Sequence, residues 1–240
     1  MPSFAKKGPD PLRLAAALGV ALLFLVVVAA AGIRLDTGIP GLRVVHRIAA
    51  SLEVLVVLWL AWMAWRRPAV QVALGLTALL SVIGIVGGQQ PPPAIAAANL
   101  LGGLALAAAF AWIFGKSGSE PDFAKPSAAQ NPSSGFARNR ALTPIFLFLL
   151  AAQAALGAWL AIVELYSAAL PAHAMLGLIL AALLSWFVRD RPLVAALALA
   201  APLAGFTALH YEYSALAALA HAAAAAALLA GGAYALARAA

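Results

Sequence analysis

Three histidines lie inside long apolar stretches of the chain, where polar side chains are costly and often functional. His46 lies in RVVHRIAASLEVL, His173 in PAHAMLG and His221 in LAHAAAA. Two neutral imidazoles facing each other across a helix bundle supply the axial ligands of a six-coordinate heme iron. Small flanking residues would let a flat macrocycle approach the backbone. The pattern predicts that His173 and His221 bind heme iron, although each could instead be a polar packing group.

One carboxyl group and two arginines accompany His46. Glu53 lies seven residues after His46, two turns along the same helical face. We expect it deep in the membrane, either handling protons or contacting a substrate, or as a protonated side chain hydrogen-bonded to a neighbouring helix. Arg34 and Arg47 are expected at the outer membrane boundary, where they could pair with heme propionates or snorkel to lipid headgroups.

The composition is that of a polytopic membrane protein. Of 240 residues, 65% are hydrophobic and 10% are charged, so lipid is the main solvent to consider. The sequence has no cysteine, which excludes disulfides, thiolate metal sites and a cysteine nucleophile. It has no HExxH motif to indicate zinc. The net charge of +7 is spread in short groups without a basic stripe, which argues against a nucleic-acid partner.

A membrane-spanning helix needs about 20 largely apolar residues, and the sequence supplies eight such runs. They cover roughly 12–33, 45–65, 69–87, 93–114, 141–163, 169–188, 192–209 and 214–237. A Ser-, Pro- and Gly-rich stretch, 115–140, is typical of a flexible linker. It separates an N-terminal four-helix half, 1–114, from a C-terminal half, 141–240.

The distribution of lysine and arginine predicts the orientation in the membrane. The outer side carries only Arg34, Arg43 and Arg47. The remaining twelve of the fifteen basic residues lie on the other side: Lys6, Lys7, Arg13, Arg66, Arg67, Lys116, Lys125, Arg138, Arg140, Arg189, Arg191 and Arg238. We therefore expect both termini and the linker to be cytoplasmic.

The two halves of the sequence resemble each other. RRPAVQVALGLTALLSVIGI aligns with DRPLVAALALAAPLAGFTAL, which places His46 opposite His173. Asn99 then falls near the position that His221 takes in the second half. The sequence predicts an all-α integral membrane protein with eight transmembrane helices in two tandem four-helix bundles, which share one orientation.

Motifs through most of the chain resemble those of the heme A synthases, the cytochrome oxidase assembly proteins that convert heme O to heme A. AAGIRLDTGIPG resembles the stretch that leaves the family's first helix, and VVHRIAASLEVLVVLWLAWMAWRRP resembles its His-Arg second helix. QVALGLTALLSVIG and QAALGAWLAIV resemble its repeated Gln-x-x-Leu-Gly motifs. PPPAIAAANLLGGLALA and YEYSALAALAHAAAAAAL resemble its fourth and eighth helices.

The resemblance implies one heme site in each half. His173 and His221 match the pair that ligates heme b in the family. His46 matches a ligand of the substrate heme in the N-terminal half, with Arg34 and Arg47 as candidate propionate partners.

Two residues depart from the family pattern in the N-terminal half. Arg43 stands where the family has a glutamate, and Asn99 stands where its fourth helix carries a histidine. An amide is a poor ligand for heme iron, and an arginine cannot act as a base. The family's cysteine pair in the outer loop is also missing.

These departures leave different functions open. One is a heme A synthase that oxidises the heme O methyl group to the heme A formyl group, with electrons passing to heme b. Another is a non-catalytic heme b-binding relative that serves electron transfer or oxidase assembly. A small-molecule transporter is disfavoured, because no helix shows a clear mid-membrane Gly/Pro break.

The resemblance also bears on location and partners. Together with the charge distribution it implies a multi-pass protein of the bacterial inner membrane. Heme O synthase or cytochrome c oxidase assembly factors are expected as possible partners, and a homo-oligomer stays open.

Overall fold

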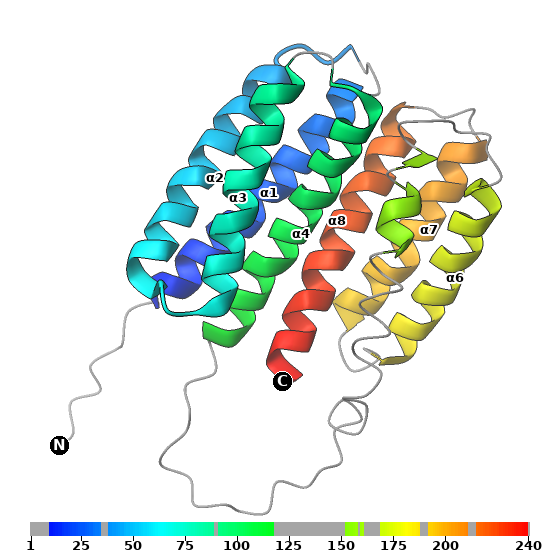
Figure 1. The fold of residues 1–240 in the computed structure, drawn as a ribbon. Coiled ribbons are helices and arrows are strands. Elements are labelled where there is room, and N and C mark those ends of the chain that lie inside the picture. Colours follow the sequence, from blue (N-terminus) through cyan, green and yellow to red (C-terminus); the bar gives the residue numbers. More distant parts are fainter. Residues whose placement is uncertain are drawn as a thin grey trace, which may run out of the picture.

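The described part of the chain is all helical in the computed structural model (Figure 1). It comprises residues 10–34, 38–88, 91–117, 152–157, 159–160, 169–187, 192–210 and 215–239. The helices are α1 (Pro11–Arg34), α2 (Leu42–Ala64), α3 (Pro68–Gly87), α4 (Pro93–Ser117), α6 (Ala169–Phe187), α7 (Pro192–His210) and α8 (Ala215–Ala239). A helical segment at 152–157 and 159–160 precedes α6.

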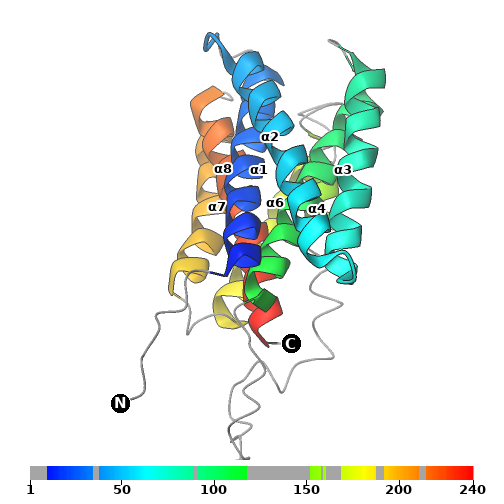
Figure 2. The ribbon, with the colours of Figure 1, turned by 90° about the vertical axis from the view of Figure 1, so that its left-hand side faces the viewer.

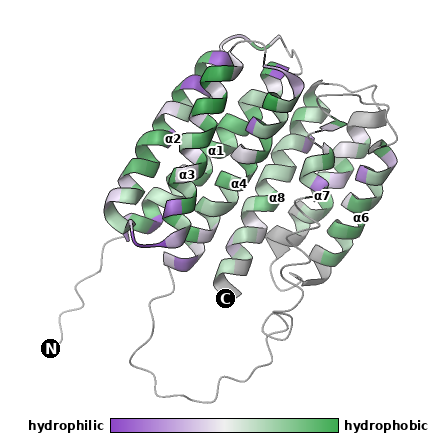
Figure 3. Cartoon of the chain, in the orientation of Figure 1, coloured by the Kyte–Doolittle hydropathy of each residue, from purple (hydrophilic) through white to green (hydrophobic). Residues whose placement is uncertain are grey.

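Five helical stretches of the described chain are long and apolar enough to cross a membrane. They are Pro11–Arg34, Leu42–Ala64, Pro68–Gly87, Pro93–Ser117 and Leu216–Ala235, and shorter apolar stretches cover Leu170–Leu183 and Ala198–Thr207. Hydrophobic residues cover most of the length of the helices, while hydrophilic ones gather toward their ends (Figure 3). The chain is therefore a multi-pass membrane protein.

The observed helices lie within a few residues of the predicted runs. The exception is the run predicted at 141–163, most of which lies outside the described residues. α4 continues to Ser117, beyond the predicted end at residue 114. Of the predicted linker, residues 118–140 lie outside the described residues.

Local sequence explains several helix ends. A proline is the first residue of α1, α3, α4 and α7, where its missing N–H and fixed φ suit the first helical turn. The carboxylate of Asp10 accepts a hydrogen bond from the Leu12 N–H at 3.0 Å, which caps α1. Gly88, with φ of 62°, ends α3 in a conformation that other residues rarely adopt.

The N-terminal helices pack against one another and against α8. α1 contacts α2, α4 and α8, whereas α3 contacts α2 and α4. α6 packs on α7, and α7 packs on α8. α8 thus lies between α1 and α4 on one side and α7 on the other (Figures 1 and 2). It joins the C-terminal helices to the N-terminal ones.

The main core fills the space between α1, α2, α3 and α4. Its largest fully buried side chains are Phe110, Leu60, Leu106, Val57 and Val70. The Phe110 ring lies directly against Gly19 of α1, where any Cβ would overlap it. Glycine at this position therefore allows α1 and α4 to approach closely.

Three helix ends meet at one end of the molecule. The guanidinium of Arg13, early in α1, lies 4.7 Å from the ring centroid of Phe114, late in α4. That ring in turn lies 5.5 Å from the ring of Tyr234, late in α8. The start of α1 and the ends of α4 and α8 are therefore on the same side of the bundle.

Candidate heme site

His173 and His221 are brought together by α6 and α8. Their ring centroids lie 6.0 Å apart and their ring planes cross at 83°. Both side chains are partly buried. The structure thus places side by side the two residues that the sequence predicts as axial ligands.

The imidazole of His221 is oriented by α7. Its Nδ1 lies 2.8 Å from the carbonyl oxygen of Ala201, so an Nδ1–H donates to that oxygen. A Cβ on Gly205, one turn further along α7, would lie 3.0 Å from Nδ1 and 3.1 Å from Cε1. Glycine is therefore needed for this close approach of ring and helix. With Nδ1 as the donor, Nε2 of His221 carries the lone pair that a metal requires.

The imidazole of His173 is oriented by the helical segment before α6. Its Nε2 lies 3.5 Å from the amide Nε2 of Gln153, and a Cβ on Gly157 would lie 2.9 Å from its Cε1. A Cβ on Gly177 would lie 2.8 Å from the Gln153 amide. Gly157 therefore lies close against the His173 ring, and Gly177 lies close against the Gln153 amide that contacts this ring.

His173 and Gln153 each have one buried polar atom without a hydrogen-bond partner among the described residues. They are Nδ1 of His173 and Oε1 of Gln153. A buried polar atom without a partner costs roughly 1–3 kcal/mol. If the Gln153 amide donates to Nε2 of His173, the ring proton is on Nδ1 and has no acceptor. If the ring proton is on Nε2 instead, the lone pair at Nδ1 has no donor. In either tautomer, one polar atom of the His173 ring thus has no partner among the described residues.

Two neighbouring imidazoles are the protein donors that a heme iron with two axial histidines requires. A metal–imidazole bond is about 2.0–2.1 Å, so two rings whose nitrogens face one metal from opposite sides have centroids roughly 6 Å apart. The ring centroids of His173 and His221 lie 6.0 Å apart, and the nitrogen of His173 that is not in contact with Gln153 is Nδ1. Among the described residues, three or more His, Cys, Asp or Glu side chains do not gather as a metal site. In a heme, the macrocycle supplies the remaining ligands of the iron.

The N-terminal half holds its histidine in a similar way. His46, partly buried on α2, has Nδ1 3.2 Å from the carbonyl oxygen of Val26 on α1. Donation from Nδ1 leaves Nε2 as the free nitrogen, as in His221. Asn99, predicted as its counterpart on α4, is partly buried and makes no hydrogen bond within the described part of the chain. The structure therefore places a single imidazole in this half.

Glu53 has a partner that the sequence did not predict. It is 5% exposed, and its Oε1 accepts a hydrogen bond from the Thr77 hydroxyl on α3 at 3.1 Å. Glu53 is thus buried between α2 and α3 with a hydrogen bond to the neighbouring helix, an arrangement that the sequence left open beside a proton-handling or substrate-contacting role.

The predicted arginines lie at the end of α1 and near the start of α2. Arg34, the last residue of α1, directs Nη2 to the carbonyl oxygen of Ala96 on α4 at 3.4 Å. Arg43 and Arg47 are exposed on the first turns of α2. Arg34 thus helps tie α1 to α4 beside the start of α2.

A small apolar cluster packs α8 against α1 and α4. It comprises Val27, Leu104 and Ala226, with Leu100, Ala154 and Leu229 packed against them. The cluster therefore joins two helices of the N-terminal half to α8, the helix that carries His221.

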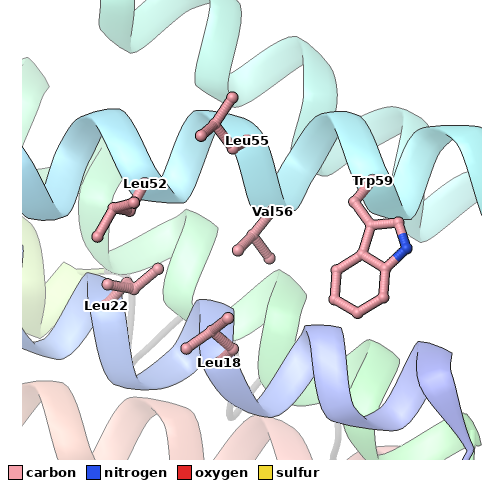
Figure 4. A pocket seen from close by; sticks show the side chains of 6 residues that line it. All are labelled: Leu18, Leu22, Leu52, Leu55, Val56 and Trp59. Carbon is pink, nitrogen blue, oxygen red and sulfur yellow. The ribbon is translucent and has the colours of Figure 1, made fainter.

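A shallow groove of about 200 Å³ lies elsewhere, between α1 and α2 (Figure 4). It is lined by Leu18, Leu22, Leu52, Leu55, Val56 and Trp59. Most of these leucines are more than 40% exposed. The groove contains none of the predicted site residues, and its composition is that of a lipid-facing surface.

Sequence reasoning missed the residues that hold the two histidines. Gln153, Gly157 and Gly205 were not predicted as site residues, although the QAALG motif contains the first two. Their spacing of four residues places them one helical turn apart on one face. That spacing was the available signal for contact with His173.

No family model matches the chain, and neither curated proteins nor solved structures give a significant match.

Proposed function

We propose that the protein binds one heme b between His173 and His221 and serves electron transfer in the membrane. The observation that carries this proposal is the pair itself, with ring centroids 6.0 Å apart. The buried Nδ1 of His173, which has no hydrogen-bond partner among the described residues, supports it. The glycines that face both rings support it as well.

Bound heme b would supply a one-electron iron couple. The residues of the chain would hold the ligands in place. Ala201 accepts the Nδ1–H of His221, which fixes its tautomer and makes Nε2 a better donor. Gln153 fixes the position of His173 from the opposite side.

The surroundings suit a low-dielectric electron-transfer site. Ala198, Ala201 and Ala226 are buried apolar residues on the helices that carry or support His221. An apolar shell limits access of water and so influences the potential of a bound metal. The apolar cluster of Val27, Leu104 and Ala226 continues this shell where α8 packs on α1 and α4.

Heme A synthesis is the second candidate function, and His46 favours it. Its Nδ1 is engaged by the Val26 carbonyl, so that Nε2 is free to bind the iron of a substrate heme. In this function, heme O would be oxidised in the N-terminal half and electrons would leave through heme b. Arg34 and Arg47 would bind the propionates, Asn99 would lie opposite His46, and Glu53 would assist as a carboxyl group. Arg43 in place of a glutamate makes the electron-transfer role the better supported of the two.

We also propose a topology for the chain. It would cross a bacterial inner membrane eight times, as two tandem four-helix bundles with both termini in the cytoplasm. Arg13 and Lys116 lie at the end of the bundle where α4 finishes, which agrees with a cytoplasmic location of that end. Oxidase assembly proteins are the proposed partners.

Heme analysis tests both functions. The full-length protein is purified in detergent, and its heme is quantified as the pyridine complex; we expect one heme b per chain. Folded protein that neither contains nor takes up heme would contradict both functions. Co-expression with a heme O source, followed by chromatography of extracted hemes, separates them: heme A or its hydroxylated precursor supports synthesis, and heme b alone supports electron transfer.

A further inference from the structure

Glu53 and Thr77 are the two buried polar residues of the described chain, and they bind each other. Each is 5% exposed, and the Thr77 hydroxyl donates to Glu53 Oε1 at 3.1 Å. Glu53 is the middle residue of α2, and Thr77 lies near the middle of α3. The pair is therefore placed at mid-depth in the apolar part of two spans.

The helices packed against Glu53 offer no charge to balance a carboxylate. α3 contains no charged residue or histidine, and α1 has none between Arg13 and Arg34. On α2 itself, the nearest such groups are Arg47 and His46, six and seven residues away. His46 is engaged by the Val26 carbonyl. In the described structure Glu53 thus has a hydroxyl donor and no counter-ion.

An ionised carboxylate in this position is unfavourable. Removing a charge from water costs far more than removing a neutral group, unless the charge is paired. A single hydroxyl donor compensates only part of that cost. The neutral carboxylic acid is therefore the less costly form of Glu53 in these surroundings, and deprotonation requires compensation from elsewhere.

We propose that Glu53 and Thr77 form an intramembrane proton-binding site in the N-terminal helices. The ligand is a proton, held by the Glu53 carboxyl group. Thr77 donates to the carboxyl oxygen and lowers the cost of releasing the proton. The site uses neither His173 nor His221, so it can exist whether or not heme b binds between them.

An apolar carbodiimide tests this proposal directly. Dicyclohexylcarbodiimide reacts with a protonated carboxyl group: the acid proton passes to a carbodiimide nitrogen and the carboxyl oxygen bonds to the central carbon. Rearrangement then gives a stable N-acylurea with nothing released. The full-length protein in vesicles is treated over a range of pH, and labelled peptides are identified by mass spectrometry. A water-soluble carbodiimide is used in parallel.

We expect the apolar reagent to label Glu53 at neutral pH and to lose this labelling at alkaline pH. The water-soluble reagent should label other members of the chain's eight acidic residues and leave Glu53 unmodified. Glu53→Gln should abolish the labelled peptide. Thr77→Val, which keeps the side-chain shape, should move the loss of labelling to higher pH because the donor that stabilises the ionised form is gone.

Ser81→Ala is the matched control. Ser81 lies one turn from Thr77 and donates to its backbone carbonyl at 2.8 Å, so its removal should leave the pH profile of Glu53 labelling unchanged. Folded protein in which Glu53 resists the apolar reagent at every pH would overturn the proposal. Labelling that stays constant across the pH range would also overturn it, because Glu53 would then be a permanently protonated packing group.

Discussion

The imidazole ring centroids of His173 and His221 lie 6.0 Å apart, and each ring contacts a polar group of a different helical segment. A residue 20 positions earlier in the chain supplies the contact in both cases, Gln153 for His173 and Ala201 for His221. His46 and Val26 show the same separation. Each of the three histidines is thus contacted by a residue 20 positions earlier, through a backbone carbonyl at His46 and His221 and through a side-chain amide at His173.

Substitution of Gly205 should weaken heme binding. In Gly205→Ala the new Cβ would lie 3.0 Å from His221 Nδ1, so the ring must shift away from Ala201. We expect about a tenfold loss of heme affinity, equivalent to about 1.4 kcal/mol, measured by titration of the heme-free protein. Gly75→Ala is the control, since a Cβ there meets no atom within 4 Å. Equal affinity in the two variants would contradict the assigned position of His221.

Gln153 should act as a positioning residue for His173. Gln153→Leu removes the amide that lies 3.5 Å from the imidazole, and loss of such an outer contact typically weakens metal binding about 10–100-fold. We also expect a shift in the midpoint potential of the bound heme, because the basicity of the ligand changes. Gln153→Glu replaces the amide by a carboxylate of similar length, which can accept an Nε2–H and leave the Nδ1 lone pair of His173 for the metal, so it should retain more of the affinity. An unchanged potential and affinity in Gln153→Leu would show that the amide does not act on the site.

Gly19 should be intolerant of a larger side chain. A Cβ in Gly19→Ala would overlap the Phe110 ring, and overpacking of this kind costs about 1–3 kcal/mol. Thermal unfolding in detergent should therefore show a lower midpoint for Gly19→Ala than for the unmodified chain.

A second substitution can identify the cause. Phe110→Leu removes part of the ring that the new methyl group meets, so the double variant should lose less stability than the sum of the single changes. Strict additivity would show that Gly19 and Phe110 do not limit the approach of α1 and α4.

The helices could largely be predicted from sequence because their cause is local. Apolar runs of span length and prolines at helix starts identify elements such as α3 and α7 without knowledge of their neighbours. The closeness of His173 and His221 was also predictable, through the comparison of the two halves. That prediction needed only the matching positions of the two halves and no knowledge of how the side chains pack.

The partners of the polar groups could not be predicted in this way. Thr77 carries no sequence signal that distinguishes it as the donor to Glu53, because the rotation of α3 about its axis decides which residue faces α2. Arg34 lies at the predicted boundary, yet its contact is a backbone carbonyl of α4. Such contacts depend on helix rotation and depth, which an almost uniformly apolar sequence specifies weakly.

The optical spectrum of heme-loaded protein tests the central claim most directly. We compare the reduced-minus-oxidised spectra of the full-length protein with those of His173→Ala, His221→Ala and His46→Ala, after confirming that each variant folds. If His173 and His221 hold heme b, the low-spin spectrum should be lost in His173→Ala and His221→Ala and kept in His46→Ala. A low-spin spectrum that survives in both His173→Ala and His221→Ala would contradict this assignment.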